Sequence, residues 1–207
     1  MPELSAHVIL LHGIWMRGFS LMLLRRRLAA AGFSTELFNY ASLYSGPQRS
    51  CARLIQRMRR SGAQRVHLVG HSLGGLIALE AVRGRTDLPV GHVVCLGSPL
   101  NGSDTARALA RRGGARYLLG QSRGLLCEGL SPWDGSRPVG VIAGDRALGF
   151  GGLIATLSTP HDGTVSVHET LLAGLADHHV LSVTHTGMVW SRPVASMVCN
   201  FLHNATF

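Results

Sequence analysis

The fold is decided by the stretch Arg65-Val-His-Leu-Val-Gly-His-Ser-Leu-Gly-Gly75. In it, a short apolar run at residues 66–69 leads into Gly70-His71-Ser72-Leu73-Gly74, and apolar residues at helical spacing begin at Leu76. The order of strand, Gly-x-Ser-x-Gly and helix is the context in which this pentapeptide indicates a nucleophilic serine on a strained turn. The alternative is a glycine-rich turn with an incidental serine, and the rest of the chain must decide between the two.

The glycines of this stretch have a steric reason. A side chain two residues before or after Ser72 would collide with the neighbouring strand or helix, so Gly70 and Gly74 leave room. The turn also puts the Leu73 amide at a helix N-terminus, where N–H groups lack an intrahelical acceptor and can stabilise an oxyanion. We therefore expect Ser72 as the nucleophile and the Leu73 N–H as one oxyanion donor.

Elements on both sides of this stretch alternate between strand and helix. Buried strands are predicted at residues 7–11, 35–40, 66–69, 92–96, 139–143 and 178–183. Helices are predicted at about 19–31, around 51–58, and at 74–82, 103–112 and about 192–202. This alternation implies right-handed crossovers and an α/β fold with a mostly parallel central sheet and helices on both faces. A length of 207 residues fits a single domain over residues 1–207.

The segment 101–137 is the least regular part of the chain. Residues 103–112 are predicted to be helical with Ser103 as the N-cap. The glycine-rich remainder, residues 113–137, indicates a loop or a short flexible cover. We expect this segment to form at most a small lid or substrate-binding insertion.

Polar side chains follow several of the predicted strands. They are His12, Ser72, Ser98, Asp145 and His185. In parallel sheets, chemistry gathers at the carboxyl ends of the strands. A serine hydroxyl needs a base within hydrogen-bond reach, and a loop after the last strand can bring the His185 imidazole over the sheet. We expect His185 to be the base and His71 to pack or hydrogen-bond instead.

Two carboxylates compete to orient this base. Asp145 lies directly at a strand end, and Asp162 lies later in His161-Asp162-Gly163-Thr164-Val165. Both precede His185, so the order serine, aspartate, histidine holds for either. Asp162 is preferred because a glycine and then apolar positions that can anchor its loop follow it. The other aspartate is expected to cap or hydrogen-bond within its loop.

The second oxyanion donor is expected in the loop after the first strand, which reads His12-Gly13-Ile14-Trp15. The Ile14 N–H is the first choice and Trp15 the next, with His12 bracing the loop through a hydrogen bond. The 11 histidines show no metal-ligand spacing with partners, so we expect neither a metal nor a cofactor.

The composition bounds the partners of the chain. The net charge is +9 and all 20 basic residues are arginines, scattered mostly over predicted helices, where a solvated face is the ordinary explanation. Since no nucleic-acid motif accompanies them, nucleic acid is not an expected partner. An anionic membrane face or an acidic substrate stays open as a peripheral partner. The four cysteines are far apart, and neither a signal-peptide pattern nor an apolar run of membrane-spanning length is present, so we expect a cytoplasmic protein.

Together these residues resemble the α/β-hydrolase superfamily, and more narrowly its small bacterial lipases and esterases. His12-Gly13-Ile14 is similar to their oxyanion loop, and Gly70–Gly75 is similar to their nucleophile elbow. Gly97–Ser103 resembles a stretch that is also seen in esterases related to GPI inositol-deacylases. Asp162–Val165 and His185–Met188 resemble the segments that carry the catalytic acid and histidine. The resemblance covers essentially the whole chain.

The resemblance implies a serine esterase or lipase-like hydrolase with Ser72, His185 and Asp162 as its triad, acting on a small acyl ester. Trp15, Met16, Leu100 and Met188 are then expected near the substrate, and Trp15-Met16, in place of small residues, implies a narrow acyl pocket. Two alternatives stay open. One is a thioesterase or acyltransferase whose arginines at 107, 111, 112, 116 and 123 meet a phosphate-bearing carrier. The other is an inactive hydrolase fold used for binding.

Overall fold

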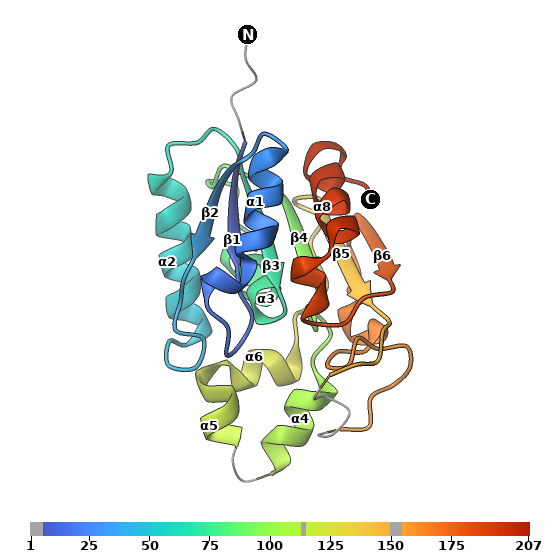
Figure 1. The fold of residues 1–207 in the computed structure, drawn as a ribbon. Coiled ribbons are helices and arrows are strands. Elements are labelled where there is room, and N and C mark those ends of the chain that lie inside the picture. Colours follow the sequence, from blue (N-terminus) through green and yellow to red (C-terminus); the bar gives the residue numbers. More distant parts are fainter. Residues whose placement is uncertain (1–5, 113–114, 150–154) are drawn as a thin grey trace.

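The computed structural model describes residues 6–112, 115–149 and 155–207. Within these ranges a six-stranded sheet has the order β2-β1-β3-β4-β5-β6, and every neighbouring pair is parallel (Figure 1). The strands are β1 His7–Leu11, β2 Ser34–Phe38, β3 Val66–His71, β4 Val90–Leu96, β5 Val139–Gly144 and β6 Asp177–Leu181. The predicted α/β class with a parallel central sheet is confirmed.

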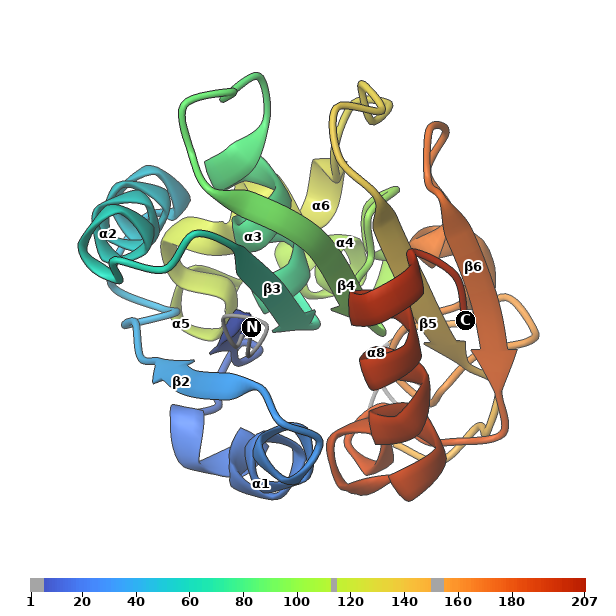
Figure 2. The same cartoon turned by 90° about the horizontal axis from the view of Figure 1, so that it is seen from above.

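Helices cover both faces of this sheet. Figure 2 shows α1 and α8 on one side and α2 and α3 on the other. Their bounds are α1 Met22–Ala30, α2 Pro47–Arg60, α3 Leu73–Val82 and α8 Arg192–Asn204. The chain runs from β1 to β2 on one side and then returns to β3 on the other, so the strand order reverses between β1 and β3. Ligands of open parallel sheets bind outside the carboxyl ends of the strands at such a reversal.

Side chains alternate along the strands to fill two cores. In β1, Val8 and Leu10 pack in the core beneath α1 and α8, whereas Ile9 and Leu11 pack in the core with α2 and α3. All four are completely buried. This burial on both faces explains why the central strands consist of continuous apolar runs rather than alternating ones.

A helical cover lies beyond the carboxyl ends of the strands, at the bottom of Figure 1. It consists of α4 Asp104–Arg111, α5 Ala115–Leu119, the 3₁₀ turn η2 Gly120–Ser122 and α6 Arg123–Glu128. The Ser103 side chain accepts a hydrogen bond from the Ala106 amide at 3.2 Å, which confirms the predicted N-cap.

The prediction of a loop after residue 113 is wrong over residues 115–128. Leu119 and Leu126 are buried in the same core as α2 and α3. Tertiary burial of this kind stabilises short helices that would be marginal alone, so glycine content underestimates them. Residues 113 and 114 lie outside the described part of the chain.

The remaining differences are small. The predicted strand at 35–40 is one residue longer in front and two shorter behind, and that at 178–183 likewise begins at Asp177 and ends at Leu181. Short 3₁₀ turns occur at η1 Gly18–Leu21, η3 Val167–Thr170 and η4 Gly187–Trp190. Among the described residues, a helix with the length and apolar character needed to cross a membrane is not found.

Candidate active site

Ser72 occupies the turn between β3 and α3 in a strained conformation, with φ 53° and ψ −122°. Residues with a Cβ rarely adopt positive φ, so this strain persists only because the surroundings hold it. A Cβ added at Gly70 would overlap the backbone nitrogen of Gly75, and one at Gly74 would overlap the Leu11 carbonyl oxygen. The predicted steric role of both glycines is thereby confirmed.

The imidazole of His185 pairs with Asp162. The His185 Nδ1 and Asp162 Oδ2 atoms lie 2.7 Å apart. Because a carboxylate only accepts hydrogen bonds, Nδ1 carries the proton and Nε2 is left as the basic nitrogen. His185 is 9% exposed and Asp162 only 1%.

The environment keeps the Asp162 carboxylate charged. Burial by itself would raise the pKa of this carboxyl, but the opposite charge and hydrogen bond of His185 lower it and prevail. The amides of Thr164 and Val165 add to this effect, since they donate to Oδ1 at 2.9 and 2.7 Å. The residues that follow Asp162 thus do anchor it, as the sequence indicated.

Asp145, the competing aspartate, lies elsewhere. It follows β5, is exposed, and its amide donates to the Leu181 carbonyl at 3.1 Å. The structure therefore brings Asp162 to His185 and leaves Asp145 in solvent.

Gly97 joins the serine turn to this pair. The Ser72 amide donates to the Leu96 carbonyl at 2.9 Å, so the turn adjoins the end of β4. At the next residue, Gly97, an added Cβ would lie 3.1 Å from both the Asp162 Oδ2 and the His185 Nδ1. Because Gly97 has no side chain, the end of β4 can pass between Ser72 and Asp162 without displacing either residue.

His71 supports the loop of His185 from below. Its Nε2 lies 3.0 Å from the His185 carbonyl oxygen, and since a carbonyl only accepts, Nε2 is the donor. Burial, followed by the nearby positive charge of His185, lowers the pKa of His71 to about 3, so the ring is neutral. The sequence-based prediction that His71 packs and hydrogen-bonds is confirmed.

The loop after β1 passes close to Ser72. A Cβ added at Gly13 would lie 3.1 Å from the Ser72 Cβ. His12 braces this loop as predicted, because its Nδ1 lies 2.8 Å from the Gly13 carbonyl and its own carbonyl accepts from the Tyr40 hydroxyl at 2.6 Å. The Ile14 amide makes no hydrogen bond to another described residue. Leu73 is the first residue of α3, so its amide also lacks an intrahelical acceptor.

Trp15 and Met16 line a groove of about 710 Å³ beside this loop. Trp15 is 56% exposed and adopts a positive φ of 61°. Its indole Nε1 donates to the Leu118 carbonyl of α5 at 2.7 Å, which ties the loop to the cover. That Trp15 and Met16 contact a substrate stays a prediction.

Leu100 and Met188 are placed differently from the expectation. Both side chains are completely buried, in separate cores, and offer no surface to a substrate in this structure. The Met188 Cε lies 3.2 Å from where a Cβ on Gly97 would be, so this side chain packs under the Asp162–His185 pair. Burial of these two apolar side chains in the cores is favourable, and it removes them from the opening above the strand ends.

The sequence analysis missed Glu169. This buried carboxylate accepts from the Ser166 amide at 2.6 Å and from the Asp104 amide at the start of α4. Burial raises its pKa. It thereby joins the cover to the segment after Asp162, and the sequence signal that could have revealed it is the capping box Ser166-x-x-Glu169.

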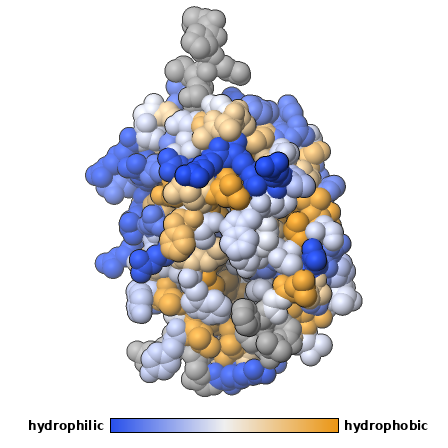
Figure 3. Space-filling view, viewed as in Figure 1, coloured by the Kyte–Doolittle hydropathy of each residue, from blue (hydrophilic) through white to orange (hydrophobic). Residues whose placement is uncertain are grey.

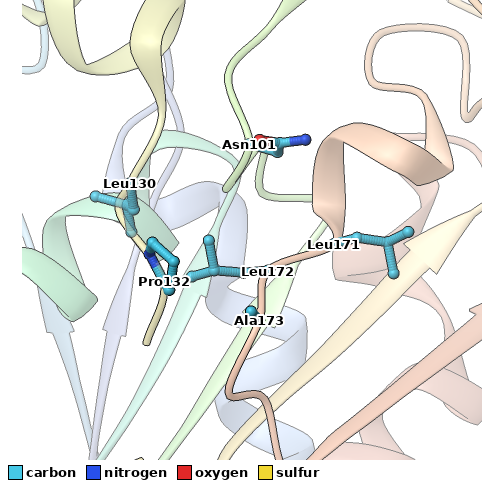
Figure 4. A pocket seen from close by; sticks show the side chains of 6 residues that line it. All are labelled: Asn101, Leu130, Pro132, Leu171, Leu172 and Ala173. Carbon is cyan, nitrogen blue, oxygen red and sulfur yellow. The ribbon is translucent and has the colours of Figure 1, made fainter. Parts of the chain in front are cut away.

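A second hollow, of about 440 Å³, contains none of the predicted site residues (Figure 4). Its lining consists of Asn101, Leu130, Pro132, Leu171, Leu172 and Ala173. Figure 4 shows Leu172 pointing toward Leu130 and Pro132. A lining of this kind offers contact to an apolar group but no acid or base.

Comparison with known proteins agrees with this fold. Residues 8–198 match the alpha/beta hydrolase family. The chain superimposes on a Bacillus licheniformis lipase in its mature form with a TM-score of 0.78 and 18% identity, over 100% of this chain and 95% of that one. A metagenomic carboxyl esterase gives 0.69 at 17%, over 89% and 66%. An Arabidopsis methylesterase gives 0.63 at 15%, over 97% and 98%. No curated protein sequence matches significantly. The likeness to GPI inositol-deacylase relatives stays a prediction.

Proposed function

This chain belongs to the alpha/beta hydrolase family, and we propose that it is a serine hydrolase that cleaves carboxylic acyl esters. The observation that carries the proposal is the strained Ser72 at the end of β3, joined through Gly97 to the buried Asp162–His185 pair. Backbone strain clusters at functional sites, where the surrounding structure maintains it. The lipase and esterase folds described above add support at the level of architecture.

In the proposed reaction the Ser72 hydroxyl attacks the ester carbonyl carbon while the His185 Nε2 takes its proton. The tetrahedral intermediate collapses, the carbon–oxygen bond to the alcohol breaks, and the same proton passes to the leaving alkoxide. Water then attacks the acyl-enzyme with His185 again as the base, which releases the acid and restores the hydroxyl. No cofactor takes part in these steps.

The remaining groups stabilise charge during this reaction. The Leu73 and Ile14 amides are the proposed oxyanion donors, because one begins α3 and the other makes no hydrogen bond to a described residue. Asp162 holds His185 in the tautomer with the proton on Nδ1 and stabilises the imidazolium that forms.

The cover is the proposed substrate-binding insertion of a single domain. It meets the oxyanion loop through the bond from Trp15 to Leu118 and meets the loop after β2 through the Ser122 hydroxyl, which donates to the Ser42 carbonyl at 3.0 Å. Trp15 and Met16 are proposed to contact the acyl ester from the groove.

Labelling with a fluorophosphonate tests the nucleophile, and p-nitrophenyl esters from acetate to palmitate test the reaction. Wild type should be labelled at Ser72 with loss of fluoride, and should hydrolyse some of these esters. Ser72→Ala should lose both activities, while Ser136→Ala, which removes an exposed hydroxyl before β5, should keep them. A wild type that is neither labelled nor active would contradict the proposal. Labelling without ester cleavage would contradict the ester substrate class and leave thioesters to be assayed.

A further inference from the structure

The groove beside the loop after β1 is lined by positively charged side chains and, among the described residues, by no negatively charged ones. Its lining comes from the loop after β1, the end and loop of β2, and one residue of α2: His12, Trp15, Met16, Arg17, Phe19, Asn39, Tyr40, Ala41, Ser42, Leu43, Tyr44 and Arg53. Two of these side chains are guanidinium groups and none is a carboxylate. Neither Arg17 nor Arg53 forms an ion pair with any carboxylate in the described ranges, although arginines elsewhere do.

Asn39, which also lines the groove, connects the segments that carry the two arginines. Its side-chain oxygen accepts from the Gly18 amide at 2.7 Å, which fixes the backbone directly after Arg17. Its carbonyl oxygen accepts from the Arg53 Nη2 at 3.3 Å. Arg53 also lies over the Phe38 ring at 5.7 Å, which leaves its other nitrogens available. One asparagine thus contacts both the Arg53 guanidinium and the backbone next to Arg17.

Met16, which lines the groove, lies close to Ser72. The Met16 Sδ lies 3.4 Å from where a Cβ on Gly13 would be, and the Ser72 Cβ lies 3.1 Å from the same point. A substrate whose carbonyl occupies the oxyanion site can therefore extend into the groove from the nucleophile. Along that path Phe19 is 73% exposed and Tyr44 is 81% exposed, so apolar surface accompanies the two charges.

Arg107 of the cover is less suited to bind an anion. Arg107 donates to the Asp104 carboxylate at 2.8 Å and to the Cys127 carbonyl at 2.7 Å, so its guanidinium already has partners. The groove cations have neutral partners only, which leaves their charge for a ligand.

We propose that this groove binds a phosphate group on the leaving-group side of the acyl substrate. The guanidinium fork matches the oxygens of a phosphate, and charge-assisted hydrogen bonds are roughly twice as strong as neutral ones. Acyl chains of fatty acids carry no phosphate, so the anion belongs to the alcohol or thiol part. The inference rests on the proposed hydrolase function and names its substrate class.

Two short esters that differ only in the phosphate test this. They are 1-butyryl-glycerol and 1-butyryl-glycerol 3-phosphate, and their short chains exclude effects of micelles or membranes. The kcat/KM of wild type should be about tenfold higher for the phosphorylated ester at low ionic strength. This preference should shrink at about 0.5 M salt, because exposed charges are screened.

Arg17→Gln and Arg53→Gln should each reduce the preference, measured as the ratio of the two kcat/KM values, about fivefold. Arg57→Gln is the matched control one turn further along α2, since that arginine is paired with Glu36 outside the groove, and it should keep the ratio. A wild type that cleaves both esters equally, or a preference that survives both groove variants, would overturn the inference.

Butyryl-CoA as a competing substrate separates the two sources of phosphate. Stronger use of the thioester would assign the groove to a nucleotide carrier, and stronger use of the glycerol phosphate ester would assign it to a lipid headgroup; both support the inference. Failure of the proposed function itself is distinguishable, because wild type would then resist the fluorophosphonate and cleave neither ester.

Discussion

We call the side of the sheet where the strands begin the amino edge and the side where they end the carboxyl edge. Each has a hollow and a buried histidine of β3, but among the described residues only the carboxyl edge has the groups that an active site needs. At the amino edge, His67 and His203 line a hollow of about 760 Å³, which is no smaller than the groove of about 710 Å³ at the carboxyl edge. Figure 3 shows hydrophilic residues gathered in a band across the upper part of the molecule, toward the amino edge. The volume of the hollow therefore does not distinguish the two edges.

The hydrogen-bond partners of the two β3 histidines distinguish the amino edge from the carboxyl edge. His67 accepts from the His92 amide at 2.9 Å, and no carboxylate lines its hollow within the described residues. His71, four residues on, supports a second histidine that is paired with a buried carboxylate beside a strained serine. General base catalysis needs a hydroxyl within reach of the imidazole and a carboxylate that stabilises the charged form of the ring.

The largest expected effect comes from breaking the carboxyl-edge chain at its acid. Asp162→Asn should lower kcat on p-nitrophenyl butyrate on the order of 10³- to 10⁴-fold, because the amide no longer stabilises the charged imidazole or its tautomer. Asp145→Asn, at an exposed position of the same edge, should change kcat less than about twofold. Equal loss in both variants would show that contact with His185 is not what selects the acid.

The two edges should also differ in how much unfolding free energy is lost when a glycine is replaced by alanine. At Gly74 an added Cβ overlaps backbone oxygens of the β1 end, whereas at Gly91 the nearest atoms are side-chain carbons of His67 at 2.8 Å and Arg65 at 2.9 Å. Backbone cannot yield as a flexible side chain can, so Gly74→Ala should lose about 3 kcal/mol or more of unfolding free energy and Gly91→Ala about 1 kcal/mol.

Urea denaturation measures both glycine variants, and fluorophosphonate labelling of each folded variant shows whether the serine turn is intact. Gly124→Ala in α6 is the control for the substitution itself, because an added Cβ there meets nothing within 4 Å. It should be neutral or slightly stabilising. A Gly74→Ala protein as stable as wild type would mean that the turn can relax.

Much of the carboxyl edge could be predicted from the sequence, because each part is encoded locally. The steric role of the glycines around Ser72 and the anchoring role of the residues after Asp162 follow from their positions in the sequence. Leu100 and Met188 could not be placed, since whether an apolar side chain enters the core or the opening depends on tertiary packing. Arg17 and Arg53 were missed because the groove joins segments that are far apart in the chain.

The cover is a second region whose structure could not be predicted from the local sequence. Residues 115–128 look like a loop by their glycines, and their helices depend on burial of Leu119 and Leu126 against distant elements. Local propensity is a weak prior that tertiary contacts override. Fold class survives such errors because it rests on many strands, whereas the shape of the substrate opening rests on a few such contacts.

Acid should sharpen the comparison between His71 and His67. Burial lowers the pKa of His71 to about 3 and that of His67 to about 4, from an ordinary value near 6.5. Below pH 6.5 each of these histidines becomes protonated in the unfolded chain, whereas in the folded protein it stays neutral down to its lowered pKa. Stability should therefore fall with decreasing pH, by about 1.4 kcal/mol per pH unit for each histidine, until the pH reaches the folded pKa.

Replacing either histidine with glutamine removes its share of that slope. Urea denaturation should show both variants less pH-sensitive than wild type between pH 6.5 and 4, and only His71→Gln still less sensitive between pH 4 and 3. His71→Gln should also slow fluorophosphonate labelling about tenfold by loosening the His185 backbone, while His67→Gln should not. Identical labelling rates would remove His71 from the positioning of His185.

The smallest effect concerns the contact between the loop after β1 and the cover at the carboxyl edge. Trp15→Phe keeps the aromatic ring and deletes the hydrogen bond to the Leu118 carbonyl, so it should lose about 0.5 to 1 kcal/mol of unfolding free energy. Trp190→Phe is the matched control, because Trp190 is also 56% exposed and its indole makes no hydrogen bond to a described residue.

Hydrogen exchange locates the loss that Trp15→Phe causes. If the indole holds the cover in place, amide exchange should accelerate in α5 and η2 and stay unchanged in α8. Trp190→Phe should leave both regions as in wild type. Faster exchange spread over the whole sheet would instead mean that the hydrogen bond of Trp15 supports the whole fold and not the cover alone.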